Sequence, residues 1–268
     1  MPELPEVETI VRGLARTIPG RRIAEVRVET PASVVNDLPG DFPALLRGER
    51  IESVSRRAKF IVFPLASGRT LTVHLRMTGR LIVEPSPAED PYARVRLHFR
   101  EGGWLRFSDV RRFGRMRLTE DGAWAAGLGV EPLDPAFTPQ RLASLLAGHR
   151  GPIKTLLLDQ RLIAGIGNIY ACEALFRAGI HPARPAGRIS GVRVRRLHSA
   201  LVRVLEEAIT WRGTSVEHYV DAEGLTGGFQ NKLAVYGREG LSCLRCHAPV
   251  KRVTLGQRGT FYCPRCQR

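Results

Sequence analysis

The stretch RTLTVHLRMTGRLIVE, residues 69–84, decides the fold of the first half of the chain. Apolar and polar residues alternate along RTLTVHLRM and again along RLIVE, with the period of two typical of strands that bury one face. Further strand candidates occupy residues 23–29, 50–65, 94–100, 104–109 and 115–120. Turn sequences such as ASGR and REGG separate these short strands, and their close spacing predicts an antiparallel β-sandwich.

The segments on either side of the strands are helical in pattern. At the N-terminus, Val7, Ile10, Val11 and Leu14 fall on one helical face, and Pro5 suits a first turn. After the proline-spaced linker EPLDPAFTP, helical patterns cover residues 140–148, 152–162, 168–179 and 192–212. We therefore expect an α+β multidomain protein. Its parts are an N-terminal helix with a β-sandwich (1–131), a helical domain (132–225) and a cysteine-bearing C-terminal segment (226–268).

Four of the five cysteines form two matched pairs, Cys243-x2-Cys246 and Cys263-x2-Cys266. Two such pairs at this separation can place four thiolates tetrahedrally around one structural zinc ion. Disulfides conflict with the cytoplasmic location expected for a chain without a signal or membrane pattern, and a redox motif does not explain two pairs. The remaining cysteine, Cys172, fits a core position on an apolar helix face.

The residues between the two cysteine pairs alternate like a hairpin, with Gln257, Arg258 and Gly259 at a possible tip. An arginine there suits a phosphate contact, although a solvated arginine fits equally well. The net charge of +15 favours a polyanionic partner in general. A compositional bias toward arginine is an alternative reading, because only four of the 41 basic residues are lysines.

The chain opens with Met1, Pro2 and Glu3, and a small second residue normally permits removal of the methionine. The exposed secondary amine of Pro2 would titrate at about 7.7–8.0, so part of it is unprotonated at neutral pH. Such an amine can attack an aldehyde-like carbon and form an iminium, while Glu3 and Glu6 transfer protons. An ordinary helix cap explains the same residues.

Two loops and one turn suit nucleic acid. In DVRRFG, Arg111 and Arg112 stand beside Phe113, a combination that can read a base edge and wedge between base steps. Met77 in HLRMTG can serve the same purpose. Asn168 can cap the helix after the glycine turn, where helix N–H groups bind phosphate. Strand-end cations, core residues and an ordinary interhelical turn are the alternatives.

Taken together, these segments resemble the formamidopyrimidine-DNA glycosylase family along nearly the whole chain. The resemblance rests on MPELPEVET, RRAKF, HLRMTG, DVRRFG, GIGNIYACEALF, AVYGREG and QRGTFYC, which occur here in the family's order. It implies a bifunctional glycosylase and AP lyase acting on oxidised purines in damaged double-stranded DNA. It also implies a helix–two-turn–helix in the helical domain, a zinc-finger hairpin, a monomer, and a place at the nucleoid.

The resemblance also assigns roles to individual residues. Pro2 is implied to attack C1′ of the damaged nucleotide, with Glu3 as proton donor, Glu6 as support and Lys59 on the lesion's phosphate. Met77, Arg111 and Phe113 are implied to fill the gap left by the flipped nucleotide, with Arg111 on the orphaned cytosine. Further DNA contacts are expected at His74, Tyr92, Arg112, Arg150, Lys154, Asn168 and Arg258.

Some positions depart from the family's usual pattern and place details of DNA contact in question. Arg76 stands where the family often has a small residue, Val110 stands where a proline is common, and Tyr92 stands where a DNA-contacting histidine is frequent. An endonuclease VIII-type relative that prefers oxidised pyrimidines is the nearest alternative, but it lacks Leu4 and the full Met77, Arg111 and Phe113 set. A non-catalytic zinc protein that binds DNA would leave the combination of Pro2, Glu3 and Lys59 unexplained.

Overall fold

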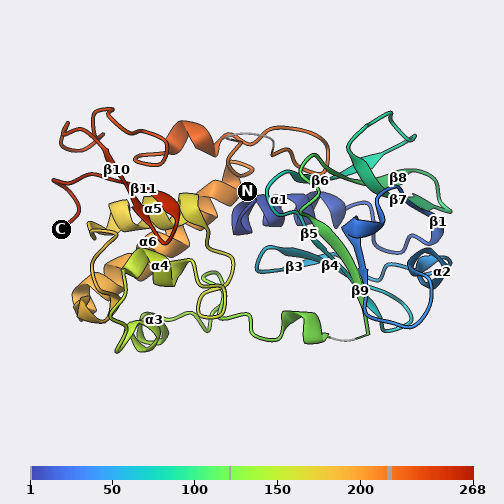
Figure 1. Cartoon of the computed structure of the whole chain (residues 1–268), viewed down its shortest axis with the longest axis horizontal. Helices are drawn as coiled ribbons and strands as arrows, with labels where there is room; N and C mark the ends of the chain where they lie inside the picture. The colour runs from blue at the N-terminus through green and yellow to red at the C-terminus, as the bar shows by residue number, and fades with distance from the viewer. Residues whose placement is uncertain (1, 121, 216–218) are drawn as a thin grey trace. The chain divides into compact units, whose positions relative to one another are not determined.

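The computed structural model describes residues 2–120, 122–215 and 219–268, and these fall into two compact units. One unit combines Met1–Ala126 with Trp211–Gly228, and the other combines Gly127–Thr210 with Phe229–Arg268. Figure 1 shows β-strands gathered in the first unit and helices in the second. No helix in the described ranges has the length and apolarity needed to cross a membrane.

The first unit is built on two sheets, which confirms the predicted sandwich. One sheet has the order β1 (Ile23–Val28), β7 (Ala93–Phe99), β8 (Trp104–Asp109), β6 (Gly79–Glu84). The other has the order β2 (Val34–Asn36), β9 (Arg115–Thr119), β5 (Thr70–His74), β4 (Phe60–Pro64), β3 (Ser55–Arg57). Neighbouring strands pair antiparallel in both sheets, except that β2 runs parallel to β9.

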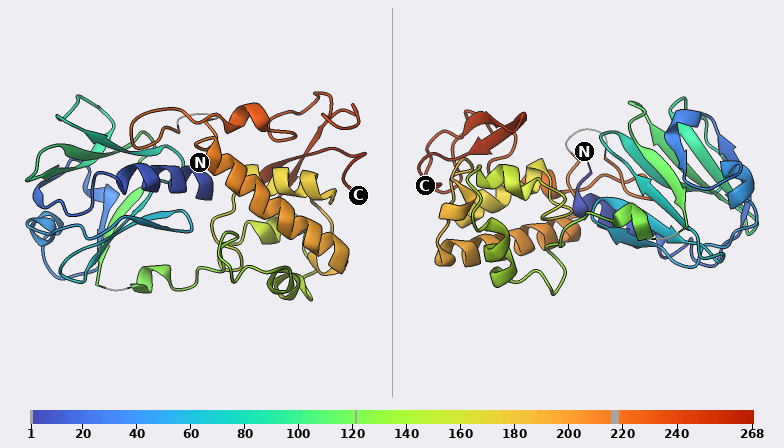
Figure 2. Two further views of the ribbon diagram at one scale, coloured as in Figure 1. Left: turned by 180° about the vertical axis from the view of Figure 1, so that it is seen from behind. Right: turned by 60° about the horizontal axis from the view of Figure 1, so that its bottom comes forward.

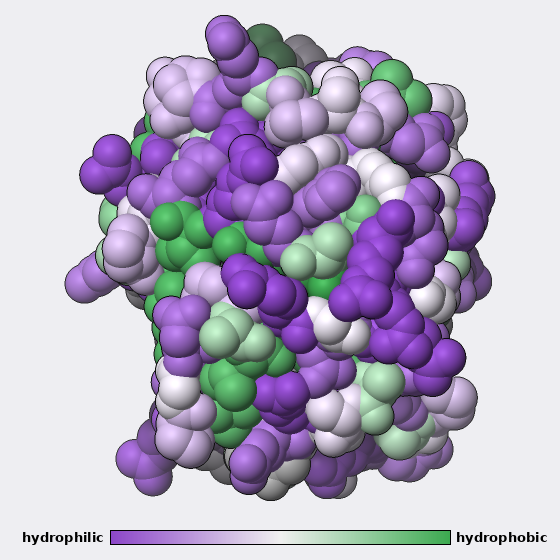
Figure 3. Space-filling model, turned by 90° about the vertical axis from the view of Figure 1, so that its right-hand side faces the viewer, coloured by the Kyte–Doolittle hydropathy of each residue, from purple (hydrophilic) through white to green (hydrophobic). Residues whose placement is uncertain are grey.

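The alternation in the sequence puts one face of each strand into a shared core. Leu71 and Val73 of β5, Leu97 of β7 and Phe107 of β8 are fully buried in it. Each such side chain contributes about 1.5–3 kcal/mol through removal from water. On the face seen in Figure 3, hydrophilic side chains predominate and apolar ones form patches between them.

Helices complete the first unit. The apolar face of α1 (Leu4–Leu14) lies in the sandwich core through Val7, Ile10 and Leu14. The short α2 (Phe42–Leu46) is capped by Asp41, whose carboxylate accepts from the Ala44 N–H at 3.0 Å. Short 3₁₀ turns lie at η1 (Pro31–Ser33) and η2 (Gly122–Ala125).

The segment 50–65, expected as a strand, is divided into a tight hairpin of β3 and β4. Arg57 pairs with Phe60, which leaves only Ala58 and Lys59 in the turn. Ala58 has a φ of 53°, a left-handed conformation that is uncommon for a residue with a side chain. The hairpin therefore places Lys59 at a defined turn position rather than within a strand.

The second unit holds the remaining helices and a two-stranded hairpin. They are α3 (Pro139–Leu146), α4 (Ile153–Leu157), α5 (Asn168–Ala178), α6 (Gly191–Thr210), η3 (Ala186–Arg188), η4 (Phe229–Lys232), β10 (Lys251–Leu255) and β11 (Arg258–Tyr262). α5 packs along α6 and also contacts β11, as both views of Figure 2 show. Because α4 ends at Leu157 and turns lead from there to α5, the two form the expected helix–two-turn–helix.

The segment Trp211–Gly228 leaves the second unit after α6 and packs with the first. Tyr219 and Ala222 join the sandwich core, and the N–H of Val83 in β6 donates to the Ala222 carbonyl at 3.1 Å. Nothing in the local pattern of this polar, glycine-rich stretch indicated that association.

Candidate active site and zinc centre

The N-terminal residues are buried and held by reciprocal capping. Pro2 is buried, and the carboxyl side chains of Glu3 and Glu6 are only 2% and 1% exposed. Oε2 of Glu6 accepts from the Glu3 N–H at 2.8 Å, while the Glu3 side chain caps the Glu6 N–H. This capping box fixes both backbone and carboxylates at the start of α1.

The second carboxylate oxygen of Glu6 is bound by the segment that returns from α6. Oε1 accepts from the Thr214 N–H at 2.8 Å. A Cβ at Gly213, whose φ is 81°, would lie 2.9 Å from that oxygen, so only glycine permits this approach. The Tyr219 hydroxyl also donates to the Glu6 carbonyl at 3.3 Å. Both oxygens of Glu6 thus serve to position the N-terminus.

An ion pair joins the Lys59 hairpin to the helix that follows Pro2. Nε of Arg56 in β3 donates to Oε2 of Glu8 in α1 at 2.9 Å. Burial raises the pKa of Glu8, but hydrogen bonds from Arg12 and Arg56 outweigh this effect and hold the pKa below its usual value. The Lys59 side chain is 6% exposed. Lys59 is therefore largely shielded from solvent.

His74, which is expected to contact DNA, supports the Met77 loop through contacts within the chain. Burial, together with nearby Arg76 and Lys59, lowers the pKa of His74 to about 3, so the imidazole is neutral at neutral pH. Its Nδ1 accepts from the Arg76 N–H at 3.0 Å, and its ring meets Phe60 edge-on at 4.6 Å between centroids. Arg76 itself has a φ of 55°. The loop that presents Met77 is therefore anchored at its start.

Asp109, at the end of β8, ties the Met77 loop to the Arg111 loop. Its Oδ1 accepts from the Thr78 hydroxyl and from the Arg111 N–H, the latter at 3.2 Å, and its Oδ2 accepts from the Gly114 N–H at 2.7 Å. A Cβ at Gly114 would lie 2.7 Å from Cζ of Phe107, which closes this turn to any other residue. One buried carboxylate thus sets the spacing of the two loops.

Asp109→Asn is expected to loosen both loops while leaving the sandwich folded. The amide nitrogen of asparagine cannot accept a hydrogen bond, so either the Gly114 N–H or the Thr78 hydroxyl loses its acceptor, at about 1–3 kcal/mol. The Arg111 N–H keeps the Thr78 hydroxyl oxygen as an acceptor. Thermal unfolding measures the effect for this variant and for Thr78→Val, which removes the hydroxyl that donates to Asp109 and accepts from the Arg111 N–H. Wild-type stability of the asparagine variant would contradict this account.

The residues between Asp109 and Gly114 project outward. Phe113 is 49% exposed, and the Arg111 guanidinium stacks on its ring with Cζ 4.7 Å from the centroid. Arg112, with a φ of 59°, is also exposed. Tyr92 is 47% exposed, and its carbonyl accepts from the Asp109 N–H at 2.9 Å. The loop that Asp109 anchors therefore presents an exposed aromatic ring and two exposed guanidinium groups.

In the second unit, two residues expected to bind phosphate, Lys154 and Asn168, donate to the zinc-finger hairpin. Nζ of Lys154 donates to the Thr260 hydroxyl at 2.6 Å and to the Gly259 carbonyl at 3.3 Å, and the side chain is fully buried. Nδ2 of Asn168 donates to the same carbonyl at 2.9 Å. Asn168 is the first residue of α5, and Gly167 is the N-cap. The predicted capping role of Asn168 is therefore wrong.

These contacts hold Arg258 at the start of β11. The hairpin turn consists of Gly256 and Gln257, both at positive φ, so Arg258 follows the tip rather than forming it. Its side chain is exposed, directly beside the fixed Gly259. Arg150 is exposed in the same unit and lines a hollow of about 560 Å³ with His149 and Arg188.

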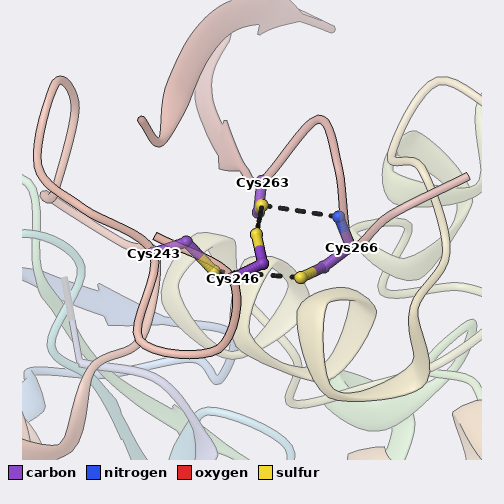
Figure 4. A group of neighbouring side chains, drawn as sticks. All are labelled: Cys243, Cys246, Cys263 and Cys266. Carbon is purple, nitrogen blue, oxygen red and sulfur yellow. Dashed lines mark hydrogen bonds between the residues drawn. The ribbon is translucent and has the colours of Figure 1, made fainter. Parts of the chain in front are cut away.

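The four paired cysteines converge as a metal site requires. All four Sγ atoms lie within 4.8 Å of one another, with 3.9 Å between Cys243 and Cys266 and 3.4 Å between Cys246 and Cys263. Tetrahedral zinc with bonds of about 2.3 Å separates its sulfurs by about 3.8 Å. Figure 4 shows the side chains pointing toward one another from two turns. Four thiolates in this arrangement fit one structural zinc ion.

Backbone donors support this cluster. The N–H groups of Arg245 and Cys266 donate to the sulfurs of Cys243 and Cys263, each at 3.4 Å. Such second contacts orient thiolate ligands. Cys172, by contrast, is a buried core residue beside the finger.

Glu173 is an important residue that the sequence analysis did not identify. Its carboxylate is fully buried in α5 and accepts from the N–H groups of Ala234, Val235 and Tyr236, each at 2.9 Å. Burial raises the pKa of Glu173 against the effect of these three donors. Glu173 anchors the chain segment that leads into the zinc finger. In the sequence, the only sign of this role is a glutamate on an otherwise apolar helix face.

Glu173→Ala is expected to lower the free energy of unfolding by on the order of 3 kcal/mol or more, since three buried N–H groups lose their acceptor. Urea unfolding followed by circular dichroism measures this, with Glu206→Ala on the exposed face of α6 as the matched control. Equal stability of the two variants would show that the loop finds other partners.

Three family models match successive parts of the chain. Residues 1–116 match the formamidopyrimidine-DNA glycosylase N-terminal domain, and residues 128–220 match the formamidopyrimidine-DNA glycosylase H2TH domain. Residues 240–268 match the zinc finger found in FPG and IleRS.

Whole proteins and structures agree with this match. The formamidopyrimidine-DNA glycosylase of Chloroflexus aggregans is 45% identical over all of this chain and 98% of its own length. That of Moorella thermoacetica is 49% identical over 94% of each chain. The crystal structure of MutM (Fpg) from Thermus thermophilus superposes with a TM-score of 0.89 at 43% identity, covering 99% of this chain and 98% of that one.

A Lactococcus lactis Fpg in complex with Fapy-dG-containing DNA also superposes, with a TM-score of 0.90 at 33% identity over 99% of this chain and all of that one. The similarity to these structures covers the sandwich, the helical unit and the zinc finger. This chain belongs to the formamidopyrimidine-DNA glycosylase family.

Proposed function

We propose that this chain excises oxidised purines, 8-oxoguanine and formamidopyrimidines, from duplex DNA, and cleaves the resulting abasic site. The observation that carries this proposal is the buried N-terminus, where Pro2 precedes the capping box of Glu3 and Glu6. A reaction at the Pro2 amine gives a reason to hold the first residues of the chain in a fixed, buried position, beyond the capping of α1. The family membership supports the same chemistry.

The proposed reaction starts once Met1 is removed. The unprotonated nitrogen of Pro2 attacks C1′ of the damaged nucleotide, and the bond from C1′ to the base breaks with its electron pair leaving on the base. The attacking nitrogen passes its proton to the departing base. Glu3 donates the proton that opens the sugar ring, which leaves an iminium between Pro2 and C1′. Loss of a C2′ proton then expels the 3′ phosphate, and loss of the C4′ proton expels the 5′ phosphate in a second elimination. Water finally hydrolyses the iminium and frees Pro2.

Other residues of the first unit position this reaction. Glu6 has both oxygens engaged by backbone donors, so we assign it to holding Pro2 and Glu3 rather than to proton transfer. Lys59, on the strained hairpin, is assigned to the phosphate at the lesion. Strain at Ala58 is consistent with that assignment, since strained residues gather at functional sites.

DNA contact is assigned to the exposed loops and the finger. Met77, Arg111 and Phe113 would fill the gap left by the extruded nucleotide. Because the Asn168 and Lys154 side chains already bind Gly259, we assign the phosphate contact to Arg258 and treat those two as its supports. Tyr92, Arg112 and Arg150 are exposed and available for further backbone contacts.

Arg111→Ala is expected to weaken binding to lesion:cytosine duplexes by about 1–3 kcal/mol more than to lesion:adenine duplexes, because a bidentate contact to the orphaned base is lost. Equilibrium binding to both duplexes measures the difference. Arg112→Ala, which removes the neighbouring exposed charge, is the control. An equal loss against both opposite bases would make Arg111 a phosphate contact instead.

Cleavage of duplexes carrying 8-oxoguanine, formamidopyrimidine or thymine glycol tests the substrate class. The proposal expects the two purine lesions to be cut faster, whereas preference for thymine glycol would favour an endonuclease VIII-type activity. We further propose that the chain acts as a monomer at the nucleoid, since one chain supplies every residue assigned above and the substrate is chromosomal DNA.

A further inference from the structure

A hollow of about 720 Å³ in the second unit has five arginines among its eight lining residues. Its charged lining residues are Arg177, Arg195, Arg196, Arg203, Arg245 and Glu207. They come from the C-terminal end of α5, one face of α6 and the first cysteine turn of the zinc finger. None of them belongs to the residues assigned to the active site or to lesion contact above.

Two of the arginines are held in place by neighbouring groups. Nη2 of Arg177 pairs with Oε2 of Glu207 at 2.8 Å. The Arg245 guanidinium lies over the Phe176 ring, with Cζ 4.4 Å from the centroid, and donates to the Phe176 carbonyl at 3.3 Å. Two walls of the hollow therefore present guanidinium groups that lose little freedom when a ligand binds.

The three arginines of α6 are exposed and, within the described residues, make no hydrogen bond or ion pair through their side chains. They are Arg195, Arg196 and Arg203. Glu207 is the single acidic residue of the lining, and it is already engaged by Arg177. Convergence of five guanidinium groups with one carboxylate is unfavourable in isolation, and a bound anion removes that repulsion.

The hollow is separate from the predicted lesion contacts of the same unit. Asn168 begins α5 and Arg177 lies near its end, so the two are about 13 Å apart along the helix axis. We propose that this arginine-lined hollow is a second anion site that takes consecutive phosphate groups, and that its ligand is the backbone of a second DNA segment. Planar guanidinium groups on several walls suit phosphate oxygens approached from more than one side.

Binding of a second duplex to the full chain tests this proposal. The protein is first saturated with a short lesion duplex, and a labelled undamaged duplex is then added and followed by anisotropy at several salt concentrations. Arg196→Ala/Arg203→Ala is expected to weaken the second event on the order of tenfold or more and to lower its salt slope by about 1.8, two phosphate contacts. Cleavage of the lesion duplex should be unchanged.

Two further variants make the test specific. Arg47→Ala/Arg141→Ala removes the same charge from exposed positions outside the hollow, and it should leave the second event within about twofold of wild type. Glu207→Gln removes the one negative charge and should strengthen it. Equal weakening by the two double variants, or no second binding event in the wild type, would overturn the proposal.

Titration with tripolyphosphate identifies the source of the phosphates. If tripolyphosphate binds the wild type and loses affinity in Arg196→Ala/Arg203→Ala while second-duplex binding is unaffected, the anion site stands but its ligand is a free polyphosphate. Loss of both supports a DNA backbone. Because lesion cleavage is read separately, failure here is distinguishable from failure of the proposed glycosylase activity.

Discussion

Borohydride is expected to cross-link this protein to lesion DNA through Pro2, and any residue left in front of Pro2 is expected to abolish the cross-link. A preceding residue turns the amine into an amide, whose lone pair is delocalised and cannot form an iminium. Mass spectrometry of the trapped peptide identifies the linked residue. Full trapping by a protein with an uncleaved N-terminal tag would refute the assignment.

Variants of the capping box separate chemistry from positioning. Glu3→Gln keeps an oxygen that can cap the Glu6 N–H but removes the transferable proton, so iminium formation, read by borohydride trapping, should fall about 10²–10⁴-fold with the fold intact. Glu6→Gln keeps one acceptor oxygen and replaces the other by a donor facing Glu3 N–H or Thr214 N–H. It should therefore lower thermal stability as well as turnover.

Loss of the zinc cluster is expected to remove DNA binding and to loosen the second unit. The finger has a small core of its own, in which Val235 and Val250 are the buried aliphatic residues. Zinc binding, worth roughly 10–16 kcal/mol in small zinc peptides, supplies most of its folding energy. Cys246→Ala or Cys263→Ser should therefore yield protein without zinc that keeps most of its helix content, because the other two cores are separate.

The hairpin contacts extend this prediction into the helical unit. When the hairpin unfolds, the buried ammonium of Lys154 and the Asn168 amide lose the Gly259 carbonyl. The unfolding temperature of the second unit should fall as well. Arg258→Ala, with zinc retained, should weaken lesion binding and reduce its salt slope by about 0.9, one phosphate contact.

Arg265→Ala, in the second cysteine turn, is the charge-matched control for Arg258→Ala. Zinc content, circular dichroism and DNA affinity at two salt concentrations give the result. A zinc-free variant that still binds lesion DNA with wild-type affinity would show that the finger plays no part in recognition.

Local pattern was sufficient for most of the strands and helices and for the metal site, but not for the division of residues 50–65 into β3 and β4 or for the short β2 and α2. Period-two alternation in residues 69–84 specified strands with one buried face, because side chains alternate across a pleated strand. Cysteine spacing specified the zinc cluster, since two short turns that each present two thiolates leave few other arrangements. The order of the family's motifs then identified the family. Composition and periodicity alone do not distinguish one protein family from another.

Only the tertiary structure decided which of these side chains are already bound by distant parts of the chain. Glu3 and Glu6 look equivalent in the sequence, yet the Thr214 N–H, 208 residues further on, occupies the free oxygen of Glu6. Asn168 and Lys154 look like phosphate ligands, yet both bind Gly259. Sequence patterns report the periodicity of burial along one segment. Hydrogen bonds between distant segments depend on how the chain returns in space, which no local period records.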